Sequence, residues 1–247
     1  MLYSEYWRSI TIHKIKKYID SSNLKDIADF VAAGNIDGIT TNPTLMYKCG
    51  IRNYAKFIED VNTVSNSLPI SYEVISSDDN EILKEAKILD NLGVNAWIKI
   101  PVIKSNGDSN IMLINSCLVD GLKINITAVF DISQLEGLVE TTKDTCIISI
   151  FAGRIADAGV DPEEVVKTFR QSELSKKTNL LWASTREAFN VIQAERSGCD
   201  IVTVQPELLY KTNKFGKNLL EFSRETVQMF EDDARSAGLF IGNSDKI

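Results

Sequence analysis

The sequence is poor in the residues from which metal centres and thiol-based active sites are built. Its 247 residues include one histidine, His13, and four cysteines that lie far apart, at positions 49, 117, 146 and 199. No two cysteines form a CxxC pair, so neither a structural zinc site nor a nucleophilic Cys–His pair is expected. We therefore predict no metal site. A chain of this length also has no need of disulfide bonds to hold its fold.

An excess of positive charge and long apolar runs are also missing. Lys and Arg number 27 against 34 Asp and Glu, and the net charge of −7 argues against nucleic acid or a membrane surface as a partner. Any anion site would have to be a local basic pocket. No apolar stretch approaches the roughly 20 residues that span a bilayer, and residues 1–17 lack the apolar segment of a secretory signal. These absences predict a soluble, cytoplasmic protein.

Short β-rich runs alternate with stretches of helical pattern along most of the chain. Strands are predicted at 15–20, 38–41, 70–75, 96–101, 124–130, 146–151, 179–184 and 200–204. Helices are predicted at 23–33, 78–92, from Asp161-Pro162 onward, at 185–197 and at 217–237. Alternation of this kind favours a parallel sheet, because parallel neighbours need crossover connections.

The number of strands and the missing phosphate-loop motifs favour one architecture. No GxGxxG or GxxxxGK[ST] sequence follows a strand, which counts against an open, nucleotide-binding sheet. We predict an α/β fold, a single-domain (β/α)8 TIM barrel over residues 1–247. Residues 1–14 would form an N-terminal extension and residues 217–237 a long C-terminal helix.

Polar side chains gather at the ends of the predicted strands. The active site of such a barrel lies at the carboxyl ends of its strands, so these residues are the candidates for chemistry. Polar groups that point inward among Ile, Val and Phe are costly unless they bind one another or a ligand. The candidates are Asp20, Asn42, Glu73, Lys99, Asn125, Thr127, Ser149, Arg154, Ser184 and Arg186.

Lys99 lies in the middle of the apolar run Trp97-Ile98-Lys99-Ile100-Pro101. Burial disfavours the charged form of a lysine, and a neutral amine can attack a carbonyl carbon to form a Schiff base. A lysine that reaches the barrel rim, or one that merely pairs with Glu73, would be an alternative.

Other candidates also have structural alternatives. Asp20 could cap the helix that follows the Asp20-Ser21-Ser22-Asn23 segment. Arg154 and Arg186 could form salt bridges at the rim with acids such as Asp157 or Glu187.

Five segments together resemble the transaldolase family. They are GITTNPTL at 38–45, WIKIPV at 97–102, ITAVF at 126–130, SIFAGRI at 149–155 and ASTR at 183–186. The resemblance runs from about Tyr18 to Leu209. It implies a barrel fold, a class I aldolase activity through a Schiff-base lysine, sugar-phosphate substrates, no metal or organic cofactor, and a homo-oligomer.

The resemblance also implies roles for single residues. Lys99 matches the Schiff-base lysine and Asp20 the acid/base carboxylate, while Glu73 and Thr127 would handle protons with a water. The remaining matches would bind substrate and are Asn42, Asn125, Ser149, Phe151, Arg154, Ser184 and Arg186.

Two residues beside the lysine separate transfer from simple cleavage. The fructose-6-phosphate aldolase branch of the family is expected to have glutamine and tyrosine there, whereas this chain has Glu73 and Phe151, the transaldolase pattern. A lyase on the same scaffold and a non-catalytic sugar-phosphate sensor are the alternatives. Thr185 and the segment 205–207 depart from the family pattern and leave room for a specialised sugar phosphate.

Overall fold

The structure of the protein is a computed structural model, and it describes residues 15–139, 141–239 and 241. The described residues form two compact units, one that ends at Tyr210 and one that begins at Lys211. The extension predicted at 1–14 lies outside the described residues. The single domain predicted over 1–247 stays a prediction.

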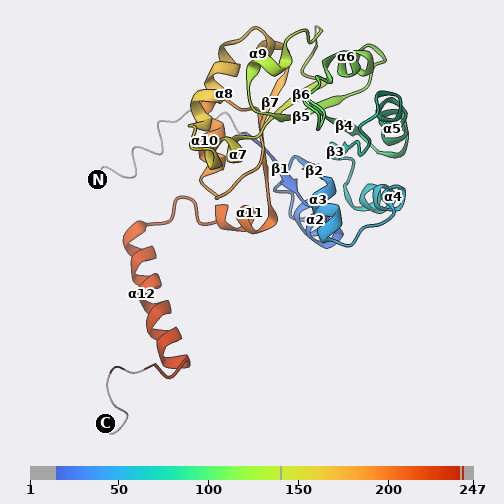
Figure 1. Cartoon of the computed structure of the whole chain (residues 1–247). Coiled ribbons are helices and arrows are strands. Elements are labelled where there is room, and N and C mark those ends of the chain that lie inside the picture. The colour runs from blue at the N-terminus through green and yellow to red at the C-terminus, as the bar shows by residue number, and fades with distance from the viewer. Residues whose placement is uncertain (1–14, 140, 240, 242–247) are drawn as a thin grey trace. The chain divides into compact units, whose positions relative to one another are not determined.

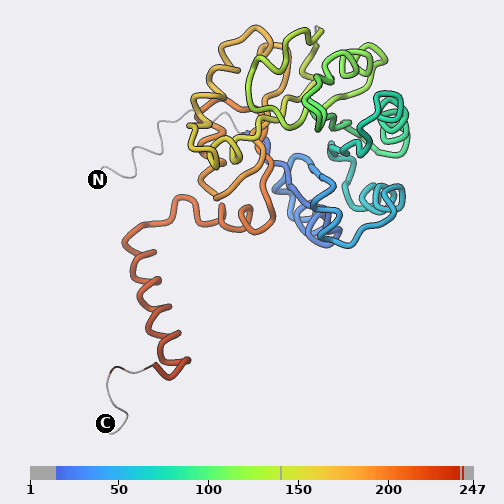
Figure 2. The backbone as a smooth tube through the Cα atoms, viewed as in Figure 1, coloured from blue at the N-terminus to red at the C-terminus, as the bar shows by residue number. Residues whose placement is uncertain are grey.

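Residues 15–210 form a closed barrel of eight parallel strands with helices around it (Figure 1). Each strand pairs with its neighbours in chain order, and β1 pairs with β8 to close the ring. Figure 2 follows the backbone around this ring from blue to orange. The strands are β1 (Lys16–Asp20), β2 (Gly38–Thr40), β3 (Ile70–Glu73), β4 (Ala96–Pro101), β5 (Ile124–Val129), β6 (Cys146–Ile150), β7 (Asn179–Trp182) and β8 (Ile201–Val204). The (β/α)8 barrel is confirmed.

Helices connect the strands and cover the outside of the barrel (Figure 1). They are α2 (Leu24–Ala32), α3 (Pro43–Lys48), α4 (Tyr54–Val64), α5 (Asp79–Leu92), α6 (Ile111–Val119), the 3₁₀ helix η1 (Ile132–Leu135), α7 (Ala152–Asp157), α8 (Pro162–Gln171), α9 (Leu174–Lys177), α10 (Asn190–Ser197) and α11 (Pro206–Thr212). In the second unit lies α12 (Leu219–Ser236). No helix within the described ranges is both long and apolar enough to cross a bilayer.

Helix starts follow local capping chemistry. Asn23 accepts hydrogen bonds from the N–H groups of Lys25 and Asp26 and so begins α2. Asp78 begins α5 in the same way, and Asp161 begins α8 with proline in its first turn. All three helices were predicted, at 23–33, at 78–92 and from Asp161-Pro162 onward.

One local prediction differs from the structure. The helix predicted at 185–197 begins only at Asn190, because the Asn190 side-chain oxygen accepts from the N–H groups of Arg186 and Glu187 and holds them in a turn.

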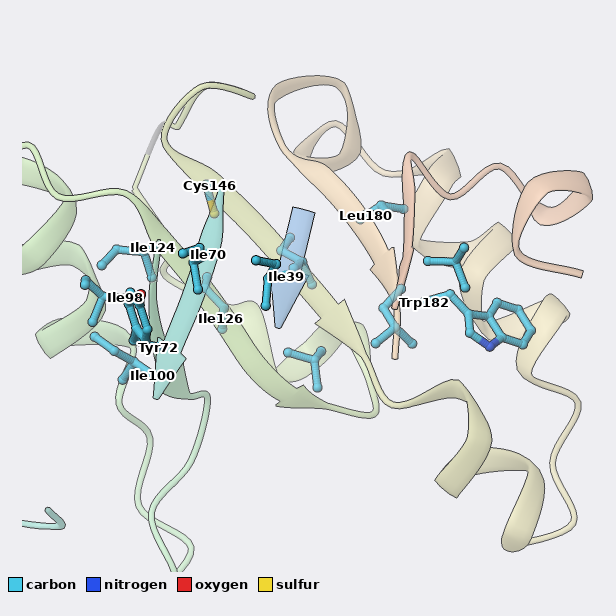
Figure 3. Packing of buried hydrophobic residues seen from close by; sticks show 14 of the residues in the cluster. Ile39, Ile70, Tyr72, Ile98, Ile100, Ile124, Ile126, Cys146, Leu180 and Trp182 are labelled. Carbon is cyan, nitrogen blue, oxygen red and sulfur yellow. The ribbon is translucent and has the colours of Figure 1, made fainter. Parts of the chain in front are cut away.

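The core of the barrel is made of strand side chains buried on both faces. All residues of β2, β6 and β8 are buried, as expected for parallel strands covered by helices. Figure 3 shows Ile39, Ile70, Ile98, Ile126 and other members of this cluster packed together. Most of these positions carry β-branched isoleucine, which suits a pleated and enclosed surface.

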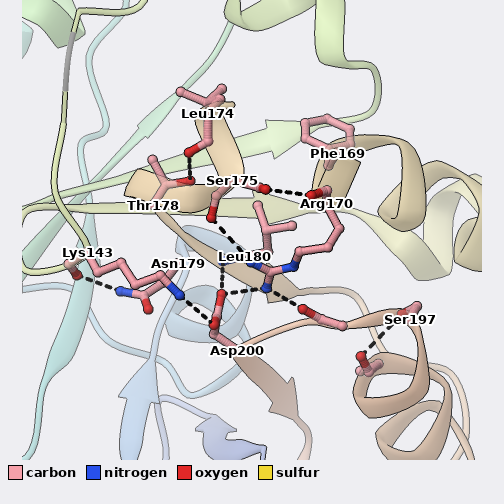
Figure 4. A network of polar contacts seen from close by, with 12 residues as sticks. Lys143, Phe169, Arg170, Leu174, Ser175, Thr178, Asn179, Leu180, Ser197 and Asp200 are labelled. Carbon is pink, nitrogen blue, oxygen red and sulfur yellow. Dashed lines mark hydrogen bonds and ion pairs between the residues drawn. The ribbon is translucent and has the colours of Figure 1, made fainter. Parts of the chain in front are cut away.

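A polar network centred on Asp200 lies where β7 and β8 begin (Figure 4). Its carboxylate accepts from Arg170 at 2.7 Å, from Lys143 at 3.0 Å and from the Leu180 N–H at 2.8 Å. Burial raises the pKa of Asp200, but these hydrogen bonds outweigh burial and lower its pKa overall. The network ties α8 to the starts of β7 and β8.

In the second unit, α12 confirms the predicted C-terminal helix. Asn218 caps it by accepting from the N–H groups of Leu220 and Glu221. Four of its apolar side chains, Leu219, Leu220, Val227 and Phe230, are each more than half exposed, whereas Phe222 is half-buried.

Candidate active site

Several candidate residues lie on neighbouring strands toward their carboxyl ends. In the sheet register, Glu73 of β3 stands beside Lys99 of β4, and Lys99 stands beside Asn125 of β5. An anionic, a cationic and an amide side chain therefore occupy neighbouring positions on three adjacent strands. This end of a (β/α)8 barrel is where its chemistry is found.

Lys99 is buried inside the barrel and does not reach solvent at the rim. Its side chain is 7% exposed, and its Nζ lies 2.8 Å from a carboxylate oxygen of Glu73. Nζ also donates a hydrogen bond to the Thr41 carbonyl oxygen at 2.9 Å. The pairing with Glu73 that was one alternative is therefore formed. It also places a proton acceptor in direct contact with the amine.

Asp20 ends β1 and accepts a hydrogen bond from the Thr40 hydroxyl at 2.9 Å. Burial raises the pKa of Asp20, opposed by the charge of Lys99 and by the Thr40 hydrogen bond. Asp20 does not cap α2, because Asn23 does so. A partly buried carboxyl group whose pKa is raised and which feels the charge of a lysine is suited to accept and return a proton.

Asn125 is held by hydroxyl groups on both sides of its amide. Ser149 donates to its Oδ1 at 2.6 Å, and its Nδ2 donates to Ser71 Oγ at 3.0 Å. All three side chains are buried. The amide is therefore fixed in orientation beside Lys99.

Thr127 has a hydroxyl group whose hydrogen-bonding capacity is unused. It is 1% exposed, and its Oγ1 has no hydrogen-bond partner among the described residues. The register between β5 and β6 shifts between Ile126 and Val129, and Ala128 adopts a φ of 56°. This bulge directly follows Thr127 and is an irregularity of the kind often found beside active sites. A buried hydroxyl without a partner costs free energy unless a ligand or water satisfies it.

Asn42 follows β2 and serves α3 as its N-cap. Its Oδ1 accepts from the Leu45 N–H at 3.0 Å, which fixes the side chain. Beside Glu73 lies a hollow of about 380 Å³, lined also by Pro43, Pro101 and Lys104. Lys99 is not among the residues that line this hollow.

Arg154 and Phe151 lie where β6 leads into α7. The Arg154 guanidinium lies 5.6 Å from the centre of the Phe151 ring, and that ring packs on Phe130 with centroids 5.8 Å apart. No ion pair of Arg154 is formed within the described residues. The rim salt bridge considered for this residue is therefore not seen.

Arg186 does form a rim salt bridge. Its guanidinium donates from two nitrogens to Asp157 and from a third to the carbonyl and hydroxyl oxygens of Ser184. The hydrogen bond from Arg186 lowers the pKa of Asp157, and the carboxylate raises that of Arg186. The side chains of Arg186 and Asp157 are 43% and 54% exposed. This pair is accessible to a competing anion.

The segment that follows β6 and the segment that follows β7 come into close contact at Gly153. A Cβ atom at Gly153 would lie 1.6 Å from the Ser184 carbonyl oxygen. Ser184 itself has a φ of 66°, in the left-handed region that non-glycine residues seldom adopt. In this backbone conformation the Ser184 hydroxyl oxygen accepts a hydrogen bond from the Arg186 guanidinium at 3.0 Å.

Several supporting residues were missed in the sequence. Thr40, Thr41 and Ser71 bind Asp20, Lys99 and Asn125, and Thr203 contacts Thr40. Thr40 and Thr41 stand in the TTNP segment, so a signal was present for them. Ser71 and Thr203 carry no such signal, because their contacts join distant strands. Among the described residues, no three His, Cys, Asp or Glu side chains cluster as a metal site would need.

Fold and site together define a class: a parallel (β/α)8 barrel with a buried lysine–carboxylate pair at its active-site end. A family model described as Transaldolase/Fructose-6-phosphate aldolase matches residues 17–240. The chain belongs to the transaldolase/fructose-6-phosphate aldolase family.

Individual relatives agree with this assignment. A probable transaldolase of Methanococcus maripaludis strain C7 is 32% identical over 201 residues, which cover 80% of this chain and 89% of that protein. A probable transaldolase of Thermoanaerobacter sp. strain X514 is 30% identical and is matched over its whole length and 92% of this chain. The solved structure of 3-hexulose-6-phosphate synthase from Salmonella typhimurium shares the fold, with a TM-score of 0.55, 15% identity, and coverage of 77% of this chain and 89% of that one.

Proposed function

We propose that this protein is a transaldolase that moves a dihydroxyacetone unit from a ketose phosphate to an aldose phosphate through a Schiff base on Lys99. The observation that carries the proposal is the buried Lys99–Glu73 pair, with Nζ and Oε2 2.8 Å apart. Two relatives that are each named a probable transaldolase support the transfer reaction.

The first half of the reaction would form the iminium ion. Glu73 takes a proton from the Lys99 ammonium, and the neutral amine attacks C2 of the ketose phosphate. The C2 oxygen is then protonated and leaves as water, with Glu73 as acid and Thr127 holding the water that relays the proton. The unpartnered Thr127 hydroxyl supports this role. Positioned proton transfer of this kind contributes about 10²–10⁴-fold to a rate.

The second half would break and remake a carbon–carbon bond. Asp20 takes the proton of the C4 hydroxyl, the C3–C4 bond breaks, and its electron pair moves into the iminium to give an enamine. The aldose phosphate leaves and a second aldose phosphate enters. The enamine attacks its aldehyde carbon, Asp20 returns its proton to the new alkoxide, and water releases the ketose from Lys99. The raised pKa of Asp20 suits a group that must both take and give a proton.

Two further groups of residues would bind the substrate. Asn42, Asn125 and Ser149 would hold the hydroxyls of the three-carbon fragment, and the fixed Asn125 amide supports this. Arg154, Arg186 and Ser184 would hold the phosphate, since guanidinium groups pair well with phosphate oxygens. Arg186 forms an ion pair with Asp157, so a phosphate that binds Arg186 would displace the Asp157 carboxylate.

A lyase that releases free dihydroxyacetone is the rival function on the same scaffold. Glu73 pairs with the lysine as a carboxylate, and Phe151 packs on Phe130 without a hydroxyl that could activate water. Both features favour transfer over cleavage. A specialised sugar phosphate as substrate is a variant of the same proposal.

The test is a product assay combined with trapping of the intermediate. With fructose 6-phosphate alone, we expect little free dihydroxyacetone; with erythrose 4-phosphate added, we expect sedoheptulose 7-phosphate. Borohydride in the presence of the ketose should add the three-carbon unit to Lys99, as peptide mass spectrometry would show. Abundant dihydroxyacetone without acceptor would identify the lyase. No adduct at Lys99 would instead fit a sugar-phosphate sensor and contradict both enzymes.

We further propose the cellular setting and assembly. The four cysteines are all free thiols in the structure, which suits the reducing cytoplasm, and pentose-phosphate metabolism is the expected pathway. The exposed apolar side chains of α12 support a homo-oligomer. Light scattering coupled to gel filtration would show a mass above 27.6 kDa if this is right.

A further inference from the structure

A second hollow with a marked charge lies outside the residues assigned to the active site. It has a volume of about 520 Å³, within the usual range of small-ligand pockets. It lies between the connection from β1 to α2 and the connection from α3 to α4, and we call it the α2–α4 pocket. Its polar and charged lining includes Ser22, Asn23, Lys25, Lys48, Arg52, Asn53, Lys56 and Asp60.

The α2–α4 pocket is basic in a protein whose net charge is −7. Lys25 and Lys56 already have carboxylate partners, Asp29 and Asp60, each at 2.6 Å. Lys48 and Arg52 are exposed and form no ion pair within the part of the chain that the structure describes. Arg52 donates only to the Ile51 carbonyl at 3.2 Å and lies 5.8 Å from the Tyr47 ring centre. The side chains of Lys48 and Arg52 are therefore two cations that could bind an anion.

Ser22 supplies an independent sign of a ligand. It lines the pocket and is 2% exposed, yet its Oγ has no hydrogen-bond partner among the described residues. A buried hydroxyl without a partner costs free energy that a bound acceptor would recover. The amino-terminal ends of α2 and α4 also line the pocket, through Asn23 and Asn53, and add partial positive charge.

We propose that the α2–α4 pocket is a second anion site that binds a phosphate group, either inorganic phosphate or the phosphate of a phosphomonoester. Lys48 and Arg52 would bind its oxygens, and Ser22 would donate its hydroxyl hydrogen to one of them. This chemistry fits a tetrahedral anion, whose several oxygens can accept from separated donors. The pocket uses no residue assigned to catalysis or to the substrate phosphate, so this inference goes beyond the proposed function.

The experiment measures binding of inorganic phosphate and, separately, of methyl phosphate by calorimetry at low ionic strength. The parent protein carries Arg154→Gln and Arg186→Gln, which removes the proposed active-site contribution. Lys48→Gln/Arg52→Gln and Ser22→Ala are then added to it one at a time. Lys16→Gln is the control, because Lys16 is exposed at the start of β1, at the other end of the barrel. Circular dichroism confirms folding, and Ser22→Ala removes an unpartnered hydroxyl, so it should not destabilise the fold.

We expect the parent and the Lys16→Gln control to bind equally. The Lys48→Gln/Arg52→Gln variant should bind about tenfold or more weakly, since two charged partners are lost. Ser22→Ala should also bind more weakly. Binding of methyl phosphate in competition with phosphate would identify a phosphomonoester site, and binding of phosphate alone a free-anion site.

Three results would overturn the proposal: no binding to the parent, equal binding to the Lys48→Gln/Arg52→Gln variant, or equal binding to Ser22→Ala. The last would mean a diffuse attraction to surface lysines rather than a built site. Failure of the proposed function is seen separately, because the wild-type protein would then bind no more phosphate than the parent does.

Discussion

Two ion pairs at the same end of the barrel have similar short distances but opposite surroundings. Lys99 and Glu73 are 7% and 18% exposed, whereas Arg186 and Asp157 are 43% and 54% exposed. The first pair stands on the inner strands β3 and β4, and the second joins the rim segments after β6 and β7. The same kind of contact therefore has different consequences in the two places.

Burial decides those consequences. Removing one partner of a buried pair leaves an uncompensated charge, whereas an exposed pair is screened by water and contributes little to stability. We infer that the Lys99–Glu73 pair transfers a proton during the proposed reaction. The Arg186–Asp157 pair would instead open to let Arg186 bind a substrate anion. The following predictions test this difference, from the largest expected effect to the smallest.

Replacement of the buried amine should have the largest effect. Lys99→Met should abolish both turnover and the borohydride adduct while the protein still folds, because a methionine suits the apolar surroundings. Lys123→Met is the matched control: Lys123 stands before β5, bonded to Asn95 at 3.0 Å, and its loss should leave turnover unchanged. Single-turnover kinetics and mass spectrometry measure both. Residual activity in Lys99→Met would mean that another amine is the nucleophile.

Changes at Glu73 should separate chemistry from stability. Glu73→Gln should lower kcat by about 10²–10⁴-fold, because the proton acceptor is gone. Glu73→Ala should also destabilise the fold, by somewhat less than the about 3–5 kcal/mol typical of a fully buried pair, since Glu73 keeps some exposure. Urea unfolding and steady-state kinetics provide the two readouts. An unchanged kcat in both variants would remove Glu73 from the mechanism.

Asp20→Asn should lower kcat/KM by about 10²–10⁴-fold and change the pH profile. Because burial raises the pKa of Asp20 above its ordinary 3.8, wild-type kcat/KM should fall as pH drops through that raised value. An asparagine cannot take up a proton, so this acid limb should be absent from the variant.

The same raised pKa makes a prediction about stability. The folded protein binds the Asp20 proton more tightly than the unfolded chain does, so ionised Asp20 opposes folding above the folded-state pKa. This destabilisation is lost as pH falls toward 3.8. Asp20→Asn should therefore be more stable than wild type at neutral pH, with a difference that shrinks on acidification. A variant less stable at neutral pH would show that Asp20 has a structural role instead.

The exposed pair should give the smallest effects. Arg186→Gln should raise KM for the sugar phosphate about tenfold, as expected for one charged hydrogen-bonding partner, with kcat nearly kept. Asp157→Asn removes the competing carboxylate and should leave KM unchanged or slightly lower. Melting temperatures of both should match wild type within error. A marked loss of stability in either variant would mean that this salt bridge holds the loops together.

Much of the fold was predictable because its signals are local. Each predicted strand lies within two residues of the observed one, and the three helices that Asn23, Asp78 and Asp161 cap were predicted from the short polar side chains before them. The helix α3 and its cap Asn42 were not predicted, because they depend on how the chain continues after Pro43.

The candidate site was predictable only in part. Lys99 and Glu73 stand out as charges within apolar strands, and their pairing was one of the stated alternatives. The Asp157 partner of Arg186 was also considered, but nothing local distinguished it from Glu187. The α2–α4 pocket could not be foreseen, because Ser22 and Lys48 become neighbours of one hollow only through the packing of α2 against α4.

The sequence by itself determined the alternation of strands and helices, their caps, and which strands carry a charge among apolar neighbours. These depend on side chains close together in the chain. Only the tertiary structure decided which hydroxyl stays without a partner, which arginine is occupied by a carboxylate, and which lysines face a common hollow. Those outcomes depend on distances between segments far apart in the chain, which arise when the barrel closes and β1 meets β8.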